Sequence, residues 1–147
     1  AVLLRLVPQL WSKARLSSVS HECILNSIES AGAYLLERLK SVQGEIVYQL
    51  CLDRKGKLLA CKRLGEGSGV SVIVDVRKLL ENAILTSASS VILGHNHPSG
   101  VALPSDDDYH ATLRAKEVLA SINVELLDHI IVADQEFVSM RQSGFVM

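Results

Sequence analysis

The sequence is poor in aromatic residues and cysteine. Aromatic side chains make up 4% of the chain and apolar ones 48%, so we expect a core of aliphatic residues. The three cysteines, Cys23, Cys51 and Cys61, lie far apart and form no Cys-x-x-Cys pair. This pattern predicts neither a disulfide framework nor a thiolate zinc site. We expect all three to be small buried apolar residues in a reducing, cytoplasmic setting.

The chain also has almost no net charge and no membrane-length apolar run. Fifteen basic and sixteen acidic residues give a net charge of −1, which provides no basic excess for gripping nucleic acid. No stretch has the length and apolar content of a membrane span, so we expect no membrane partner. Residues 1–7 are apolar but are followed by Pro8 and lack a charged leader, so they do not predict a signal peptide.

The length of 147 residues suits one domain with a substantial core. We expect residues 1–18 to be an N-terminal remnant and residues 19–147 to form the domain. Apolar periodicity predicts helices over residues 20–39 and 75–87, the second burying Leu79, Leu80, Ala83 and Ile84, and a third helix from Ser105 to about residue 122. Strands are predicted over residues 46–52, 57–64, 70–74, 90–93, 124–132 and 136–140, with a flexible glycine-rich connection over 65–69. This order predicts an α/β fold with a mixed central sheet flanked by helices.

A polar loop follows the predicted strand at residues 90–93 and contains two histidines. In an extended segment His95 and His97 point to the same side, so both can face one ion, and Pro98 biases His97 away from helical geometry. A carboxylate, Asp108, follows eleven residues after His97. Imidazole and carboxylate ligands of this kind hold a divalent transition metal, most often zinc.

Asp108 also has a simpler explanation. Ser105-x-x-Asp108 resembles a capping box, and acids at positions 106–108 suit the positive end of a helix dipole. A carboxylate used for capping is less available to a metal, so the two interpretations of Asp108 compete. Capping alone accounts equally well for Asp106 and Asp107.

The string His95-x-His97-Pro98, six intervening positions (99–104), then Ser105-x-x-Asp108, resembles the JAMM metallopeptidase motif of MPN domains. With its surrounding residues, and with 126–132, it is similar to the RadC branch of that superfamily. The resemblance implies an MPN/JAMM-like fold with the layered architecture of cytidine deaminases. It implies one zinc ion held by His95, His97 and Asp108, with Glu45 as general base and Ser105 stabilising the oxyanion.

The activity implied by this resemblance is hydrolysis of a peptide or isopeptide bond by metal-activated water, with a protein or peptide as substrate. Two alternatives stay open: a DNA repair-associated protein, and a metal-bound interaction module without catalysis. Contact with nucleic acid is not supported by the charge, but relatives carry an upstream helix-hairpin-helix region that would allow it. A deaminase is disfavoured because its His-x-Glu and Pro-Cys-x-x-Cys signatures do not occur. The oligomeric state is not readable from the sequence.

Three further histidines are not part of this motif. His21 and His110 stand alone on predicted helices, and we expect both at the surface. Asp128 and His129 are neighbours in a predicted strand, where their side chains face opposite sides. One of them could support a ligand imidazole from behind, but we favour a packed or edge polar pair without a role at the site.

Overall fold

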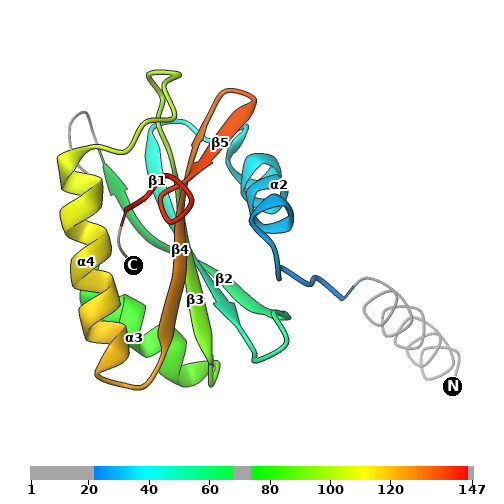
Figure 1. The fold of residues 1–147 in the computed structure, drawn as a ribbon, viewed down its shortest axis with the longest axis vertical. Coiled ribbons are helices and arrows are strands. Elements are labelled where there is room, and N and C mark those ends of the chain that lie inside the picture. The colour runs from blue at the N-terminus through cyan, green and yellow to red at the C-terminus, as the bar shows by residue number, and fades with distance from the viewer. Residues whose placement is uncertain (1–21, 68–73, 146–147) are drawn as a thin grey trace, which may run out of the picture.

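The computed structural model describes residues 22–67 and 74–145 (Figure 1). The predicted N-terminal remnant and His21 lie outside these ranges. The helices are α2 (Ile28–Leu39), α3 (Val76–Leu85) and α4 (Asp106–Ala120), and the strands are β1 (Glu45–Leu52), β2 (Leu58–Gly67), β3 (Ser90–Asn96), β4 (Glu125–Ala133) and β5 (Glu136–Ser139). The strands form one sheet in the order β2-β1-β3-β4-β5. Strands β3 and β4 are parallel, and the other neighbouring pairs are antiparallel.

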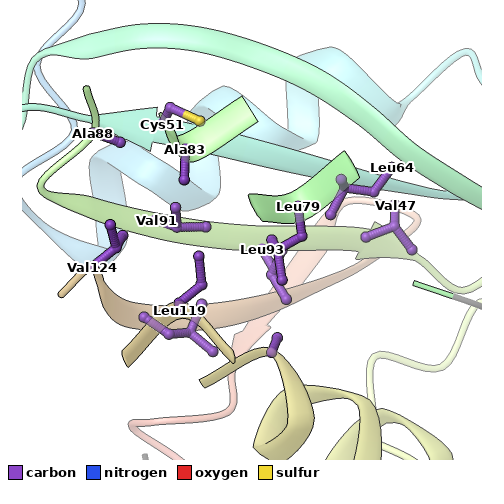
Figure 2. Packing of buried hydrophobic residues seen from close by; sticks show 12 residues of the cluster. Val47, Cys51, Leu64, Leu79, Ala83, Ala88, Val91, Leu93, Leu119 and Val124 are labelled. Atoms are coloured by element: carbon purple, nitrogen blue, oxygen red, sulfur yellow. The ribbon is translucent and has the colours of Figure 1, made fainter. Parts of the chain in front are cut away.

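Helices cover both faces of this sheet. Figure 1 shows α2 on one side and α3 with α4 on the other. Beneath α2 the core contains Leu35, Leu50 and Ile130. Beneath α3 and α4 it contains aliphatic side chains from both helices and the central strands, seen in Figure 2. The prediction of a mixed sheet flanked by helices with an aliphatic core is confirmed.

The cysteines differ from one another in burial. All three are free thiols, and Cys51 is completely buried, whereas Cys23 and Cys61 are half-buried. The prediction of full burial is therefore right for Cys51 alone. Burial raises the pKa of the Cys51 thiol, which keeps it protonated. No helix in the described ranges is long and apolar enough to cross a bilayer.

The glycine-rich connection was predicted to begin at residue 65, but β2 continues through it to Gly67. Residues 65, 66 and 67 pair with Val47, Ile46 and Glu45 of β1. The longer hairpin forms because β1 is itself extended from Glu45, so its partner gains ladder hydrogen bonds up to the same level. Most of the strand predicted at residues 70–74 lies outside the described residues, and Val74 is not in a strand.

Helix α2 begins at Ile28, eight residues after its predicted start. Preceding residues pair with the β1–β2 hairpin instead: Ile24 forms a bridge with Lys57, and the amide of Leu25 donates to Gly56 O at 2.7 Å. Ser27 then caps the helix through a reciprocal box with Ser30. Tertiary pairing therefore overrides the apolar periodicity of residues 22–27.

Two glycines let α2 approach the sheet closely. A Cβ on Gly32 would collide with the ring of Phe137 in β5, and one on Gly94 in β3 would collide with the side chain of Leu35. The helix therefore rests directly on β3 just before His95. Gly32 lowers helix propensity, but in this structure it permits packing that a larger residue would block.

Helices α3 and α4 begin where predicted. Asp75 caps α3, and its carboxylate accepts from Lys78 N at 3.1 Å. Leu79 and Ala83 are buried as expected, but Leu80 is only half-buried and Ile84 is 60% exposed, because the face of α3 against the sheet is narrow. Ser105 caps α4, which ends at Ala120, and Asn123 has φ of 60° in the turn into β4.

Candidate metal centre

The two histidines of the loop lie where β3 leaves the sheet. Strand β3 is central and buried along its whole length, and His95 is its penultimate residue. The chain stays extended beyond β3, because His97 N donates to Val132 O of β4 at 2.8 Å. His95 and His97 therefore face the same side, as the spacing predicts, and their Nε2 atoms lie 2.8 Å apart.

Asp108 reaches both rings from the first turn of α4. Its Oδ1 is 3.1 Å from His95 Nε2 and its Oδ2 is 3.2 Å from His97 Nε2. The same carboxylate completes the capping box, since Oδ2 accepts from Ser105 N at 2.8 Å while Asp108 N donates to Ser105 Oγ at 3.1 Å. Capping and facing the imidazoles were expected to compete. They coexist because Oδ2 contacts both Ser105 N and His97 while Oδ1 is left to contact His95.

Glu45 completes the group from the first position of β1. Strands β1 and β3 are antiparallel and Val47 is paired with His95, so the start of β1 lies beside the end of β3. Glu45 Oε1 is 3.8 Å from His95 Nε2, and its side chain is 11% exposed. One ligand atom from each of Glu45, His95, His97 and Asp108 falls within 4.8 Å of the others. The structure thus brings together four of the five residues expected at the site; Ser105 is not in this group.

The protonation of Asp108 and His97 depends on their contacts with each other and with neighbouring groups. Burial alone would raise the pKa of Asp108, but hydrogen bonds with His95 and His97 hold it well below its usual range. The hydrogen bond with Asp108 raises the pKa of His97, against an opposing effect of burial. His97 Nδ1 lies 2.9 Å from Val101 O, an atom that can only accept, so Nδ1 carries a proton and Nε2 is the atom offered to the site.

Asn96, between the two histidines, was not predicted to have a role. Its side chain points to the opposite side and is buried. It accepts from Ile46 N at 2.8 Å and donates to Gly44 O at 2.7 Å, so one amide fixes the backbone on both sides of Glu45. Alternation along β3 predicts the direction of this side chain, but its partners depend on the pairing of β1 with β3.

His129 lies behind His95, which corrects our preference for a polar pair without a role. His129 Nε2 is 2.7 Å from His95 Nδ1, and on its other side Nδ1 contacts the hydroxyl of Thr112 in α4. The ring is completely buried, and burial lowers its pKa well below the usual value. Asp128 faces the other way, where it accepts from Ser139 Oγ and Arg141 N. Thr112 was missed because no local pattern connects it with His129.

The other residues considered in the sequence analysis lie near the start of α4. Ser105 Oγ caps the helix, as the capping pattern predicts, and the oxyanion-stabilising role that the resemblance implies for it stays a prediction. Asp106 and Asp107 are exposed and belong only to the helix start, and His110 is at the surface as predicted.

A cavity of about 620 Å³ lies away from this group, at the amino end of β3 beneath the start of α2. Its lining includes Ser27, Ser90, Ile92 and Leu127 and none of the four grouped residues. The group of possible metal ligands and the cavity therefore lie at different ends of β3. We place the site at the group of Glu45, His95, His97 and Asp108, since among the described residues the carboxylates that line the cavity, Asp53, Glu125 and Asp128, form no such cluster of possible metal ligands.

A family model described as a RadC-like JAB domain matches residues 25–145, which include Glu45, the histidine loop and α4. The chain belongs to the RadC family. The sheet and helices above are therefore those of a RadC-like JAB domain, and the polar group at the end of β3 is a candidate metal centre within it.

Bacterial relatives of this RadC-like domain carry names that specify no activity. A UPF0758 protein of Alteromonas mediterranea is 36% identical over 128 residues, which cover 87% of this chain and 57% of the relative. UPF0758 proteins of Nitrosococcus oceani and Azotobacter vinelandii are 39% and 40% identical, covering 84% and 83% of this chain and 55% and 54% of theirs. The chain thus spans a little over half the length of these relatives.

Proposed function

We propose that this chain is a zinc-dependent hydrolase that cleaves an amide bond in a peptide or isopeptide. The convergence of Glu45, His95, His97 and Asp108 from β1, β3, the following loop and α4 carries the proposal. Two imidazole nitrogens and a carboxylate match the ligand set of zinc, and three protein ligands are the number typical of catalytic zinc sites. His95, His97 and Asp108 would hold the ion. Zinc bound there would supply a Lewis acid that polarises a carbonyl group and lowers the pKa of water.

Glu45 is the general base of this proposal. Its carboxylate lies beside His95 without being part of the Asp108 capping network, so it is free to accept a proton from the attacking water. The same carboxyl group then donates that proton to the departing amine nitrogen. Asn96 supports this role by fixing the backbone at residues 44 and 46, which limits the movement of Glu45.

The loop that joins His97 to Ser105 favours a protein or peptide substrate. Its Val101 and Leu103 are 52% and 69% exposed, so the segment that links His97 to Asp108 presents two apolar side chains to solvent. Apolar residues in such a position can bind side chains that flank a scissile bond. A net charge of −1 disfavours nucleic acid as the partner of this chain. Duplex or single-strand DNA binding that weakens steeply with salt would favour the DNA repair-associated alternative.

The decisive experiment combines metal analysis with hydrolysis assays on a panel of peptides and isopeptide-linked conjugates. Wild type should contain one zinc per chain. Glu45→Gln should keep the zinc and lose about 10²–10⁴-fold in turnover, the range for loss of a general base. Asp107→Asn, an exposed acid next to Asp108, is the matched control and should behave as wild type in both assays.

Two results would contradict the proposal. Purified wild type without zinc would remove its basis, and turnover by Glu45→Gln equal to wild type would remove the assigned mechanism. A full complement of zinc without hydrolysis of any substrate in the panel would instead favour the non-catalytic interaction module.

A further inference from the structure

A continuous set of hydrogen bonds runs behind His95 and has no part in the chemistry proposed above. It starts at the backbone carbonyl of Asp108, 2.6 Å from Thr112 Oγ1. It continues from that hydroxyl to Nδ1 of His129, and from Nε2 of His129 to Nδ1 of His95. All three side chains are at most 2% exposed, so water does not compete for these bonds.

The direction of each hydrogen bond follows from the first acceptor in the series, the backbone carbonyl of Asp108. A backbone carbonyl can only accept, so the hydroxyl hydrogen of Thr112 points to Asp108 O. Met140 Sδ, at 3.5 Å, is a poorer acceptor for the same hydrogen. With its one hydrogen used, Thr112 Oγ1 can only accept from His129, and Nδ1 of His129 must carry a proton.

The protonated nitrogen of His129 determines the form of His95. A completely buried, neutral His129 with its proton on Nδ1 has a bare Nε2, which can only accept. His95 Nδ1, 2.7 Å away, must therefore donate, so Nδ1 of His95 carries a proton in every state of the chain. A neutral His95 then has its lone pair on Nε2, the atom that faces Asp108 and His97.

We propose that Thr112 and His129 form a tautomer relay, a hydrogen-bonded pair that keeps Nε2 of His95 free to bind the metal. The inference rests on the metal-binding part of the proposed function. Thr112 and His129 are positioning residues, since neither faces the ligand group. Helix α4 thus acts on the site twice: Asp108 contacts the rings directly, and Thr112, one turn later, sets the tautomer of His95 from behind.

The tautomers can be observed directly in the zinc-free protein. Long-range proton–nitrogen NMR spectra of the 147-residue chain should show His95 and His129 both protonated on Nδ1. A nitrogen–nitrogen coupling between His95 Nδ1 and His129 Nε2 should report the bond that joins them. A His95 ring without a proton on Nδ1 in the wild type would overturn the relay.

Substitutions of Thr112 distinguish the tautomer relay from a role in packing alone. Thr112→Val has nearly the same shape but removes the acceptor for His129 Nδ1–H, so His129 should shift its proton to Nε2 and force His95 into the unsuitable tautomer. Zinc affinity should fall about 10–100-fold, as for other residues that orient a ligand. Thr112→Ser keeps the hydroxyl and should restore both the tautomers and the affinity. Equal zinc affinity of the Val and Ser variants would overturn the relay.

His129 provides a second comparison if Thr112→Val does not fold. His129→Gln can present an amide oxygen to His95 Nδ1–H and should retain more zinc affinity than His129→Leu, which cannot accept. A Leu variant that binds zinc as tightly as the Gln variant would overturn the inference. Failure of the proposed function would look different: a wild type with the inferred tautomers that binds no zinc would refute the metal site, although the hydrogen bonds from Thr112 to His95 would stand as inferred.

Discussion

Helices α2 and α4 both begin with a capping box, and the two boxes lie at opposite ends of β3. In α2, Ser27 Oγ accepts from Ser30 N and Ser30 Oγ accepts from Ser27 N, both at 3.1 Å. In α4, Ser105 and Asp108 form the equivalent pair. The first box borders the cavity, and the second borders the group of possible metal ligands. A capping box thus identifies a helix start but not a function.

The chemical difference lies in the third residue of each helix. Ser30 uses its hydroxyl for the cap alone, whereas Asp108 has two oxygens and uses them for the cap and both imidazoles. The cap restricts the rotamer of the carboxylate and so aims it at the rings. Local helix-capping physics therefore contributes directly to the geometry of the candidate metal centre.

The largest expected effect is on zinc content, when the third residue of each helix is substituted. Asp108→Asn can still accept from Ser105 N but loses the negative charge, so the fold should persist while stoichiometric zinc is lost. Ser30→Ala should leave the zinc content at the wild-type level. Metal analysis of the two purified variants, with circular dichroism to verify folding, tests this. Full zinc in Asp108→Asn would mean that Asp108 serves only as a cap.

An intermediate effect is expected from the capping serines. Ser27→Ala and Ser105→Ala should each lower the free energy of unfolding by about 1 kcal/mol in urea titrations, since each removes one N-cap acceptor. Only Ser105→Ala should also weaken zinc binding, by about 10-fold, because it loosens a group that orients a ligand. If zinc titrations find the two variants equal, the cap does not aim the carboxylate.

The smallest expected effect is a pH dependence of stability. It should come from the capping box of α4, which contains a carboxylate, and not from that of α2, which is uncharged. In the zinc-free chain, Asp108 raises the pKa of His97, so this pair stabilises the fold below the usual histidine pKa and loses that contribution as pH rises through the raised value. Urea midpoints measured with a chelator should therefore fall between about pH 6 and pH 9. Asp108→Asn should reduce this slope, whereas Ser30→Ala should keep it.

Zinc should reverse that dependence, because the ion competes with protons for the imidazole nitrogens and binds more tightly as pH rises. Zinc titrations over the same pH range measure the effect. An affinity that does not change with pH would contradict ligation by His97.

Much of this centre was predictable because its determinants are local. The i, i+2 spacing of His95 and His97 required an extended segment, and the preceding apolar run supplied one. Ser105 and Asp108 carried their capping pattern in four consecutive residues. The resemblance to a known motif, rather than any property of a glutamate at the start of a strand, pointed to Glu45.

The misplaced features depend on contacts between distant segments. Helix α2 starts late because Ile24 and Leu25 pair with the β1–β2 hairpin. The glycine-rich segment extends β2 because the β1 ladder continues to Glu45. The contacts of Asn96 and His129 likewise depend on strand partners far away in the chain, and periodicity within one segment does not identify them.

The amino-acid sequence by itself determined the order of helices and strands, the aliphatic core and the two histidines on one side of an extended loop, because backbone geometry and hydrophobic periodicity act over a few residues. Only the tertiary structure decided that Glu45 lies beside His95 and that His129 and Thr112 stand behind it. Those placements follow from the register of β1 against β3 and β4 and from the packing of α4, where cooperative hydrogen bonding and burial join segments that share no local pattern.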